Sequence, residues 1–369
     1  MVSHADILIL GGGIIGCALA DELARHGCQV LVVERERLGQ EASSAAAGIL
    51  SAQVDCVQPD SVFELCQAAR RMYPRWVEHL ERRSDLSVGY HVDGIVSLAM
   101  NGREERALSQ QARWQLKQGL RVERWSRKEL RRNEPHVDGK IRAGFYFPNE
   151  AQVDNVRLMQ ALAIACRKAG VEVKEQTTVN RLIVRGRVIW GVETNRGQLS
   201  ARIVVNCLGS WASMGGSFPV PVPIEPLRGQ MLAFRSSSRV FRRILVSQRA
   251  YVVQRRDNRL ICGSTMEPAG FTKALTIEGM EGILSGLRQI SRALDPCLFL
   301  EAWAGFRPAT ADRRPILGET AIDGLYVAAG HFRHGILLAP ITAQVMADLI
   351  LRGRSVLDIK PFSPQRSAS

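Results

Sequence analysis

A strand that runs into a glycine-rich turn near the N-terminus constrains this chain more than any other feature. Residues 7–16 read Ile-Leu-Ile-Leu-Gly-Gly-Gly-Ile-Ile-Gly, and the next apolar run ends at Glu34, eighteen positions past Gly16. Gly11 permits the tight turn, Gly13 lets a pyrophosphate approach bare backbone, and Gly16 lets the following helix pack against the strand. The spacing is therefore typical of a dinucleotide-binding fingerprint.

The order of elements around this turn favours dinucleotide binding over a glycine-rich turn in an unrelated α/β protein. We expect an amphipathic helix over 14–26 and a second strand over 29–33, followed directly by the acid Glu34. Phosphates would bind the free N–H groups at the start of the helix, where the aligned peptide dipoles amount to roughly half a positive charge. Glu34 would accept hydrogen bonds from a ribose 2′-hydroxyl and repel the extra phosphate of NADP. FAD and NAD both satisfy this pattern.

Length and composition predict a soluble cytoplasmic protein of two domains. The 369 residues exceed one ordinary core. Eight cysteines occur without any Cys-x-x-Cys spacing, so neither a zinc ribbon nor a disulfide framework is indicated. The first strand begins almost at the N-terminus, without a basic and an apolar leader segment, so we expect no export signal. The longest apolar stretch, 335–351, is interrupted by Pro340, Gln344 and Asp348, and we expect no membrane span.

The formal net charge of +13 raises the question of nucleic acid, an acidic membrane surface or an anionic small molecule as a partner. The arginines lie in scattered pairs, such as Arg131-Arg132 and Arg242-Arg243, rather than in a long tract with interleaved aromatic residues. A solvated, arginine-rich surface is the favoured interpretation, and we expect no nucleic-acid partner.

Periodicity and turn signals predict the elements along the rest of the chain. Further helices are expected over 62–83, 103–119, 126–133, 154–169 and 277–294, with a terminal helix after the last strand. Further strands are expected over 94–100, 144–147, 171–174, 188–194, 201–207, 229–234, 251–255, 260–264 and 325–328. Asp154 is expected to cap its helix, Gly209 to lie at the carboxyl edge of a sheet, where cofactors bind, and residues 361–369 to form a mobile tail.

These elements predict an α/β protein in which a Rossmann-like nucleotide domain carries an inserted, mostly antiparallel β-sheet domain of α+β type. The nucleotide domain is assembled from residues 1–85, 150–218 and 302–369, and the substrate domain from residues 86–149 and 219–301. The nucleotide domain is thus discontinuous, because the second domain is inserted in two pieces.

Four segments carry a resemblance to a known family. They read Gly-Gly-Gly-Ile-Ile-Gly at 11–16, Ser-Ser-Ala-Ala-Ala-Gly at 43–48, Trp-Ala-Gly-Phe-Arg-Pro at 303–308 and Gly-His-Phe-Arg-His-Gly-Ile-Leu-Leu-Ala-Pro at 330–340. Over nearly its whole length the chain resembles the bacterial glycine oxidases of the D-amino-acid oxidase family of flavoproteins. The first segment is generic, and the last two are much more specific. The chain departs from the family pattern at His334, often asparagine in relatives, and at Arg313, usually glycine.

The resemblance implies a non-covalently bound FAD, which makes the Rossmann-like domain an FAD-binding domain. The residues that it assigns to the cofactor are Ile14, Ile15, Glu34, Arg35, Ala42, Ser43, Ala47, Gly48, Ile49, Val179, His331, Phe332, Arg333, His334, Gly335, Ile336 and Leu337. The glycine fingerprint adds Gly11, Gly13 and Gly16, and the predicted sheet edge adds Gly209. His331 and His334 are three positions apart and have no neighbouring carboxylate or thiolate, so we expect no metal site there.

The resemblance also implies that Arg307 and Arg333 bind the carboxylate of a substrate amino acid, with Tyr251 alongside. A planar guanidinium can hold a carboxylate bidentately and so fix the substrate over the flavin. The alternatives are a surface salt bridge for either arginine and simple packing for Tyr251. No side chain in the predicted site is an obvious base, so the substrate amine must lose its ammonium proton on or before binding.

The favoured function is FAD-dependent oxidation of glycine or another small amino acid, such as sarcosine or a D-amino acid. The products are an imine or 2-oxo acid and hydrogen peroxide, which forms from O2. Similar enzymes supply the imine to thiamine thiazole synthesis and form homotetramers. Three alternatives stay open: a D-amino-acid dehydrogenase with a quinone acceptor, a flavoprotein that modifies a tRNA wobble uridine, and a non-catalytic flavin-binding module.

Overall fold

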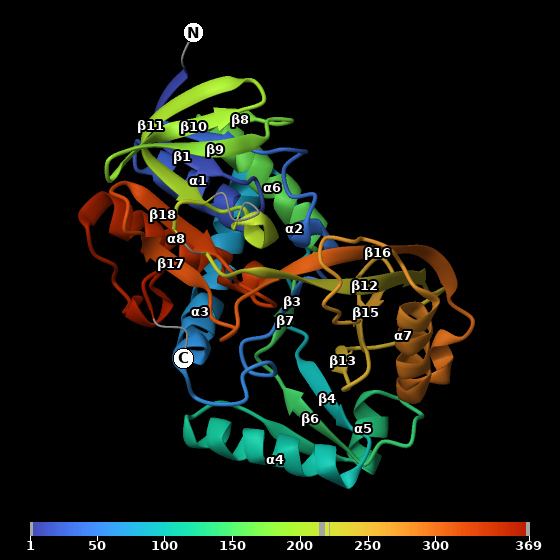
Figure 1. Cartoon of the computed structure of the whole chain (residues 1–369). Helices are drawn as coiled ribbons and strands as arrows, with labels where there is room; N and C mark the ends of the chain where they lie inside the picture. The colour runs from blue at the N-terminus through green and yellow to red at the C-terminus, as the bar shows by residue number, and fades with distance from the viewer. Residues whose placement is uncertain (1–2, 214–217, 221, 367–369) are drawn as a thin grey trace.

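Two large β-sheets with their covering helices make up the computed structural model, which describes residues 3–213, 218–220 and 222–366. In Figure 1 the first sheet lies toward the top of the molecule and the second runs from its middle to the lower right. Three separate stretches of the chain contribute strands to the first sheet, and two stretches contribute strands to the second. Segments far apart in the sequence therefore lie side by side in each sheet.

The first sheet has a parallel centre that is buried on both faces. Its main path has the order β17-β18-β11-β1-β2-β8, and β18, β11, β1, β2 and β8 run parallel to one another. Along β1, Ile7 and Ile9 face one hydrophobic core while Leu8 and Leu10 face the other. Helices and loops must cover both faces, as expected for a parallel sheet. The bounds are β1 Ser3–Leu10, β2 Val30–Val33, β8 Glu172–Lys174, β9 Val179–Arg185, β10 Val188–Thr194, β11 Gly197–Asn206, β17 Ile316–Glu319 and β18 Leu325–Ala329.

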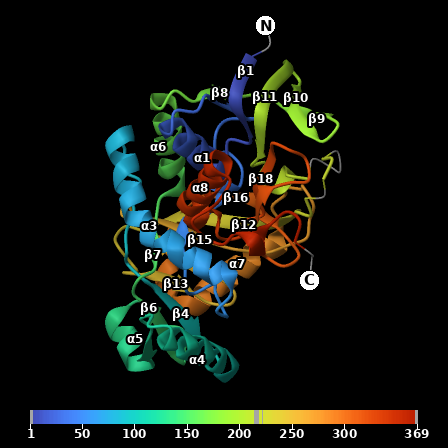
Figure 2. The same cartoon turned by 90° about the vertical axis from the view of Figure 1, so that its left-hand side faces the viewer.

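Four helices pack together against one face of this sheet, and Figure 2 shows them grouped beside it. They are α1 Ile14–Arg25, α3 Ser61–Ser84, α6 Asn155–Lys168 and α8 Gly335–Arg352. By length and composition α8 is the one candidate membrane span among the described residues, but 67% of it is buried inside the fold. It packs against α1 and α3, so its apolar surface is used by the core.

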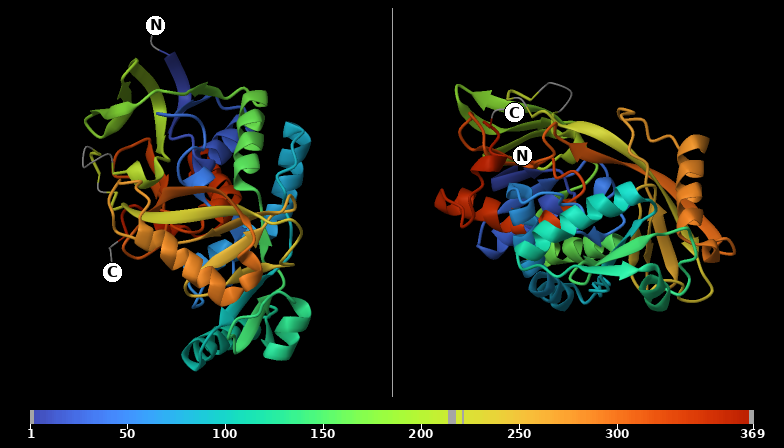
Figure 3. Two further views of the ribbon diagram at one scale, coloured as in Figure 1. Left: turned by 90° about the vertical axis from the view of Figure 1, so that its right-hand side faces the viewer. Right: turned by 90° about the horizontal axis from the view of Figure 1, so that it is seen from below.

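The second sheet is mostly antiparallel and has the order β16-β12-β15-β14-β13-β4-β6-β5, with β13 and β4 as its parallel pair. The bounds are β4 Ile95–Ala99, β5 Glu123–Ser126, β6 Ala143–Phe147, β12 Glu225–Arg235, β13 Ile244–Val246, β14 Tyr251–Gln254, β15 Arg259–Gly263 and β16 Leu298–Ala309. Helix α7, Ile277–Ile290, packs on β12, β14 and β15 and appears in orange in Figure 3. Helices α4, Gly102–Lys117, and α5, Arg127–Asn133, cover the other end of the sheet.

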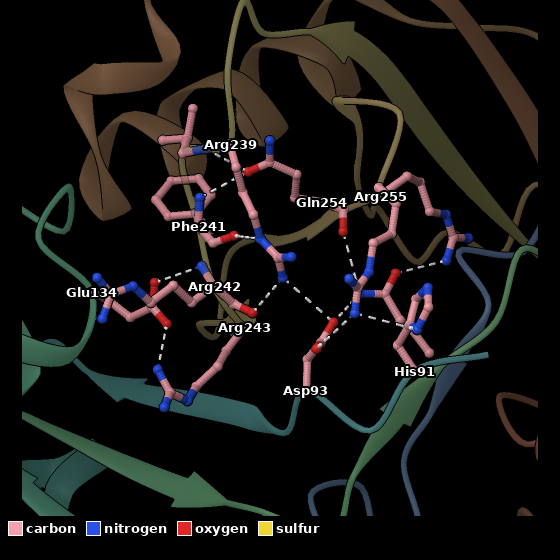
Figure 4. A network of polar contacts seen from close by, with 12 residues as sticks. His91, Asp93, Glu134, Arg239, Phe241, Arg242, Arg243, Gln254 and Arg255 are labelled. Carbon is pink, nitrogen blue, oxygen red and sulfur yellow. Dashed lines mark hydrogen bonds and ion pairs between the residues drawn. The ribbon is translucent and has the colours of Figure 1, made fainter. Parts of the chain in front are cut away.

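Polar contacts fix the segment that leads from β12 into β13 (Figure 4). Arg239 pairs with Asp93 at 3.5 Å. The buried carboxylate of Glu134 accepts hydrogen bonds from the backbone N–H of Arg242 at 2.9 Å and from the side chain of Arg243 at 3.0 Å. The backbone before β13 is thereby held in place, and with it the turn that connects β13 to β14.

Most of the predicted helices are confirmed. Helices α3, α4, α5 and α6 occupy the four segments predicted between residues 62 and 169. Asp154 caps α6 as predicted, since its side chain accepts hydrogen bonds from the backbone N–H groups of Val156 and Arg157, both at 3.2 Å. Residues 42–45, in the segment of small residues after β2, form the short helix α2, Ala42–Ala45.

The helix predicted over 277–294 is wrong at its C-terminal end. Helix α7 stops at Ile290, Ser291 is extended at φ −160°, and a separate 3₁₀ turn follows at Arg292–Leu294. The hydroxyl of the fully buried Ser291 donates a hydrogen bond to the carbonyl of His136 and accepts one from the backbone N–H of Ala293. These bonds compete with the helical pattern, as serine side chains often do.

The tail predicted to be mobile is docked as far as it is described. Residues 360–362 form a 3₁₀ turn, and Phe362 is only 2% exposed. Arg366 forms an ion pair with Asp312 at 2.9 Å and donates to the carbonyl of Pro315 at 3.0 Å. The prediction is therefore wrong for residues 361–366, while 367–369 lie outside the described residues. The buried Phe362 side chain and the Arg366–Asp312 ion pair anchor the segment. The segment is short and mostly polar, and its sequence therefore predicted neither contact.

Sequence analysis missed strands β5, β9, β13, β16 and β17, and also β3, Ile49–Leu50, and β7, Ala151–Gln152, which pair as a small two-stranded sheet. The sequence of β16 lacks strict alternation of apolar and polar residues and contains Pro308, which weakens a strand signal. It is nevertheless a strand because it pairs with β12 from Leu298 to Ala309. Strand β16 runs without a break across residue 302, where the last stretch of the nucleotide domain was predicted to begin. The domain boundaries stay a prediction.

Candidate active site

The turn between β1 and α1 is built so tightly that side chains cannot enter it. Gly11 has φ +100°, and a Cβ there would lie 2.6 Å from the carbonyl oxygen of Cys207. A Cβ on Gly16 would lie 2.0 Å from the carbonyl oxygen of Gly11. The turn therefore presents bare backbone at the start of α1, and the hydroxyl of Ser43 accepts a hydrogen bond from the backbone N–H of Ile14 at 2.9 Å.

Glu34 stands at the end of β2 beside this turn. Its Oε2 accepts a hydrogen bond from the backbone N–H of Gly12 at 2.7 Å, and its Oε1 accepts one from the backbone N–H of Glu36 at 3.0 Å. These two bonds hold the carboxylate against the glycine turn, at the position from which an acid contacts a ribose in dinucleotide-binding folds.

A cavity of about 370 Å³, which we call the nucleotide cleft, opens from the glycine turn. The predicted cofactor residues that line it are Gly11, Gly13, Ile14, Ile15, Glu34, Arg35, Ala42, Ser43, Val179, Gly209, His331, Phe332, Arg333, Gly335 and Ile336. Arg35 stacks on the ring of Trp211 with its guanidinium carbon 3.8 Å from the ring centre. Bare backbone at a helix start, an acid at a strand end and a long apolar groove fit the phosphates, ribose and rings of FAD.

A second cavity of about 240 Å³, which we call the arginine cavity, adjoins the nucleotide cleft, and both are lined by Ala42, Ala46, Phe332, Arg333 and Ile336. The predicted residues Ala47, Gly48, Ile49, Tyr251 and Arg307 line the arginine cavity. Of the other predicted residues, Gly16, His334 and Leu337 line neither cavity. Their contribution comes through the packing of α1 and α8.

Arg307 lies on β16 and points across the sheet into this cavity. Its guanidinium donates to the carbonyl of Thr265 at 3.1 Å and to the hydroxyl of Ser264 at 2.6 Å, and a Cβ on Gly229 would lie 2.2 Å from Arg307 Nη1. Burial lowers the pKa of Arg307. No carboxylate forms an ion pair with it in the part of the chain that the structure describes. A partly buried cation without an acidic partner favours the binding of an anion beside it.

Tyr251 begins β14 beside Arg307. Its hydroxyl lies 3.2 Å from Met231 Sδ, and burial raises its pKa, so that the side chain is a neutral phenol with a proton to donate. A Cβ on Gly263 would lie 2.8 Å from the Tyr251 hydroxyl. Glycines at 229 and 263 thus leave room around the two polar heads.

Arg333 is placed differently from Arg307. It follows β18 in the segment before α8, its side chain is 44% exposed, and it pairs with Asp55 at 3.6 Å. Its guanidinium also lies 5.2 Å from the ring centre of Phe332. Asp55 therefore offsets the charge of Arg333 within the same cavity.

The two histidines of the 330–340 segment are buried and neutral. Nε2 of His331 lies 3.0 Å from Thr342 Oγ1, and burial lowers the pKa of His331 to about 3. Burial also lowers the pKa of His334. Within the described residues no three potential metal ligands cluster.

Several lining residues were missed by sequence reasoning. Trp211 and Ser264 each belonged to the end of a predicted strand but were given no role, and Asp55 and Arg249 gave no signal at all. Each lies on a loop or a 3₁₀ turn, and neither periodicity nor a motif marks such positions before the fold brings them together.

Comparison with known proteins agrees with this geometry. The model of the DAO family, FAD dependent oxidoreductase, matches residues 6–349. The chain is 36% identical over 374 residues to the bifunctional protein ThiO/ThiG of Synechocystis sp.. That alignment covers 99% of this chain and 54% of the ThiO/ThiG protein. It is 32% identical over 372 residues to the glycine oxidase of Geobacillus kaustophilus, with 99% and 98% of the two chains covered. The crystal structure of glycine oxidase from Geobacillus kaustophilus superposes with a TM-score of 0.96 at 30% identity, covering 100% of both chains. The chain spans about half the length of the ThiO/ThiG proteins that it matches.

Proposed function

The chain belongs to the DAO family of FAD dependent oxidoreductases, and from that premise we propose that it oxidises glycine or a similarly small amino acid. O2 would accept the electrons and become hydrogen peroxide, and the imine would hydrolyse to a 2-oxo acid. The names of relatives that cover nearly the whole chain support glycine as the substrate. The small amino acid and O2 are thus its proposed partners.

One observation carries the proposal: Arg307 is a partly buried guanidinium with no acidic partner among the described residues, in a cavity that adjoins the nucleotide cleft. A substrate carboxylate would supply the missing anion. A charge-assisted hydrogen bond of this kind contributes roughly 1.5–3 kcal/mol when it is shielded from water. The binding of the carboxylate then fixes the direction of the Cα–H bond.

FAD, when bound, would supply the oxidising power by accepting two electrons and one proton, as a hydride, from the substrate. The chain supplies orientation. Ser264 and the carbonyl of Thr265 hold Arg307 from behind, and the neutral hydroxyl of Tyr251 can donate a further hydrogen bond to the carboxylate. Among the described residues lining the arginine cavity no histidine or lysine is present, and the one carboxylate, Asp55, is paired with Arg333. We therefore propose that the substrate amine loses its ammonium proton on or before binding.

The biological role and the assembly are proposed on the same basis. Relatives named ThiO/ThiG support delivery of the imine to thiamine thiazole synthesis. A homotetramer, a cytoplasmic location and the absence of a nucleic-acid partner stay predictions.

The proposal is tested by hydrogen peroxide release from the purified flavoprotein with glycine, sarcosine, D-amino acids and L-amino acids, with a quinone analogue as a parallel electron acceptor. Arg307→Ala should raise KM for glycine by about 10- to 100-fold, the loss of one or two charge-assisted bonds, without reducing flavin content. Arg196→Ala, an exposed arginine on the β10–β11 turn, is the matched control. Normal glycine turnover by Arg307→Ala would refute the role of its guanidinium, and turnover with the quinone alone would identify a dehydrogenase.

A further inference from the structure

Asp55, the one acidic side chain among the described residues that line the arginine cavity, forms an ion pair that leaves its hydrogen-bonding capacity unused. Its Oδ1 lies 3.6 Å from Arg333 Nη1, which is too long for a hydrogen bond. No described residue donates a hydrogen bond to this carboxylate, and the side chain is 31% exposed. A ligand in the cavity can therefore approach both heads of the pair.

The backbone that carries Asp55, the loop over 51–56, is fixed by three buried glutamines. Gln67 on α3 donates to one carbonyl of this loop at 2.8 Å. The side-chain amide of Gln111 on α4 donates to three of its carbonyls at 3.0, 2.9 and 2.9 Å, and that of Gln115 donates to two of them. Helices beside both sheets thus hold Asp55 at the wall of the cavity, which an ordinary surface acid does not require.

Asp55 and Arg333 both lie close enough to Arg307 to act on it electrostatically. Burial lowers the pKa of Arg307, Tyr251 opposes this effect, the charge of Arg333 lowers the pKa further, and that of Asp55 raises it. Arg307 and Tyr251 form the place proposed for the substrate carboxylate. The negative charge of Asp55 therefore lies beside that place, next to Arg333.

An amino acid matches this arrangement better than a carboxylic acid without an amine. Its amine nitrogen and its carboxylate carbon are joined through one carbon by bonds of about 1.5 Å, so its two polar ends are about as close together as the heads of the Arg333–Asp55 pair. A bare carboxylate on Arg307 and Arg333 would leave Asp55 facing a like charge, whereas an amine supplies a donor that relieves this repulsion. The amine can donate to Asp55 both as ammonium and after it has lost one proton.

We propose that Asp55 is a specificity-determining residue that accepts a hydrogen bond from the substrate amine, so that the site selects amino acids over carboxylic acids of the same shape. This inference rests on the proposed function. In the complex the substrate carboxylate replaces Asp55 beside Arg333, and the substrate amine replaces Arg333 beside Asp55. One internal ion pair is thereby exchanged for two contacts with the substrate, while the backbone of the 51–56 loop stays in place.

The binding test compares glycine with propionate, in which a methyl group replaces the amine. The flavoprotein reduced with dithionite and kept free of O2 has no electron acceptor, so it binds glycine without oxidising it, and calorimetry gives both dissociation constants. The wild type should bind glycine about tenfold more tightly than propionate, the equivalent of one charge-assisted bond, and Asp55→Asn should abolish this preference. Asp55→Glu should keep part of it. Asp323→Asn, which changes an exposed aspartate before β18 that does not line the cavity, is the control.

The pH dependence of the reaction gives a second measurement, which a folding defect would not imitate. The described residues with charged or titratable side chains that line the cavity are Asp55, Arg249, Tyr251, Arg307 and Arg333. A neighbouring carboxylate favours the ammonium form of a bound amine, so removal of the Asp55 charge should lower the pKa of that amine. In rapid mixing without O2, the rate of flavin reduction by saturating glycine should reach half its maximum about one pH unit lower in Asp55→Asn than in the wild type. An unshifted profile would contradict the contact.

The binding test also separates this inference from simple charge compensation and from the proposed function. If Asp55 only competed with ligands for Arg333, Asp55→Asn would strengthen the binding of glycine and of propionate by the same factor, and the preference for glycine would survive. That result, in an enzyme that oxidises glycine, would overturn the inference alone. If no amine is oxidised, the proposed function fails, while the two dissociation constants still decide whether Asp55 recognises the amine.

Discussion

Glu150 is a buried carboxylate whose ionisation is costly. It is completely shielded from solvent, and its Oε2 accepts a hydrogen bond from the backbone N–H of Gln53 at 3.2 Å. Arg70 is the nearest cation, with Nη1 4.0 Å from Oε1, which is too long for a hydrogen bond. Burial outweighs these partners and raises the pKa of Glu150 to about 7.

This shift predicts how stability depends on pH. Because the native pKa lies above the ordinary value of 4.5, the native state binds more protons than the unfolded state between these two values, and the group's contribution to stability falls as pH rises through that window. Glu150→Gln removes this dependence. Its free energy of unfolding, compared with that of the wild type, should increase by up to about 3 kcal/mol between pH 4.5 and pH 8. Urea denaturation across this range measures it, with the exposed Glu301→Gln as control, and a constant difference would contradict it.

The C-terminal segment is held against the fold by a buried aromatic side chain and an ion pair. The last described segment docks through Phe362, which is 2% exposed and belongs to the same hydrophobic core as α1, α3 and α8. It lies next to β17, where a Cβ on Gly318 would be 3.2 Å from Pro364. The C-terminal segment is therefore part of the first sheet's packing rather than an appendage.

Truncation of the Phe362 side chain should lower the stability of the fold. Phe362→Ala is expected to lower the free energy of unfolding by about 3–5 kcal/mol, because it removes buried apolar area and leaves a cavity. Val356→Ala, at a site that is 66% exposed, should change it by less than about 0.5 kcal/mol. Thermal and urea unfolding of the two variants measure this difference. If Phe362→Ala and Val356→Ala had equal free energies of unfolding, the docked segment would contribute nothing to stability.

Across the whole molecule, Arg255 joins the second sheet to the loops beside both cavities. It follows β14 and donates to the carbonyl of Ala47 at 2.8 Å, to Gln152 Oε1 at 2.9 Å and to Asn155 Oδ1 at 3.3 Å. Burial lowers its pKa to about 10, so it stays charged at neutral pH. One guanidinium thereby holds the 46–48 backbone, which lines the arginine cavity, against the start of α6.

Removal of this guanidinium should loosen both the fold and the cofactor site. Arg255→Met leaves three buried acceptors without a donor, and we expect a loss of about 2–4 kcal/mol in the free energy of unfolding together with a lower flavin content. Arg256→Met, which changes an exposed neighbour 4.0 Å from Asp93, should affect neither. Denaturation and the flavin-to-protein absorbance ratio provide the two measurements. Full flavin content with wild-type stability in Arg255→Met would show that the contact is dispensable.

The sequence by itself determined the nucleotide half of this protein. The spacing of Gly11, Gly13, Gly16 and Glu34 encodes a local strand, turn and helix. Such local requirements of the backbone can be recognised directly in the sequence, because they involve residues close together in the chain. The helices of that half followed from periodicity and caps, as Asp154 shows. The family resemblance singled out Arg307 and Arg333, which line one cavity in the structure, but it did not indicate that their surroundings differ.

Only the tertiary structure decided how charge is distributed in the arginine cavity. Asp55 compensates Arg333, whereas Arg307 is held by Ser264, and these relations join positions up to nearly three hundred residues apart. β16 likewise became a strand because β12 offers it a partner. Pairing and ion compensation are non-local, since their free energy exists only when distant segments meet, and no single stretch of sequence records it.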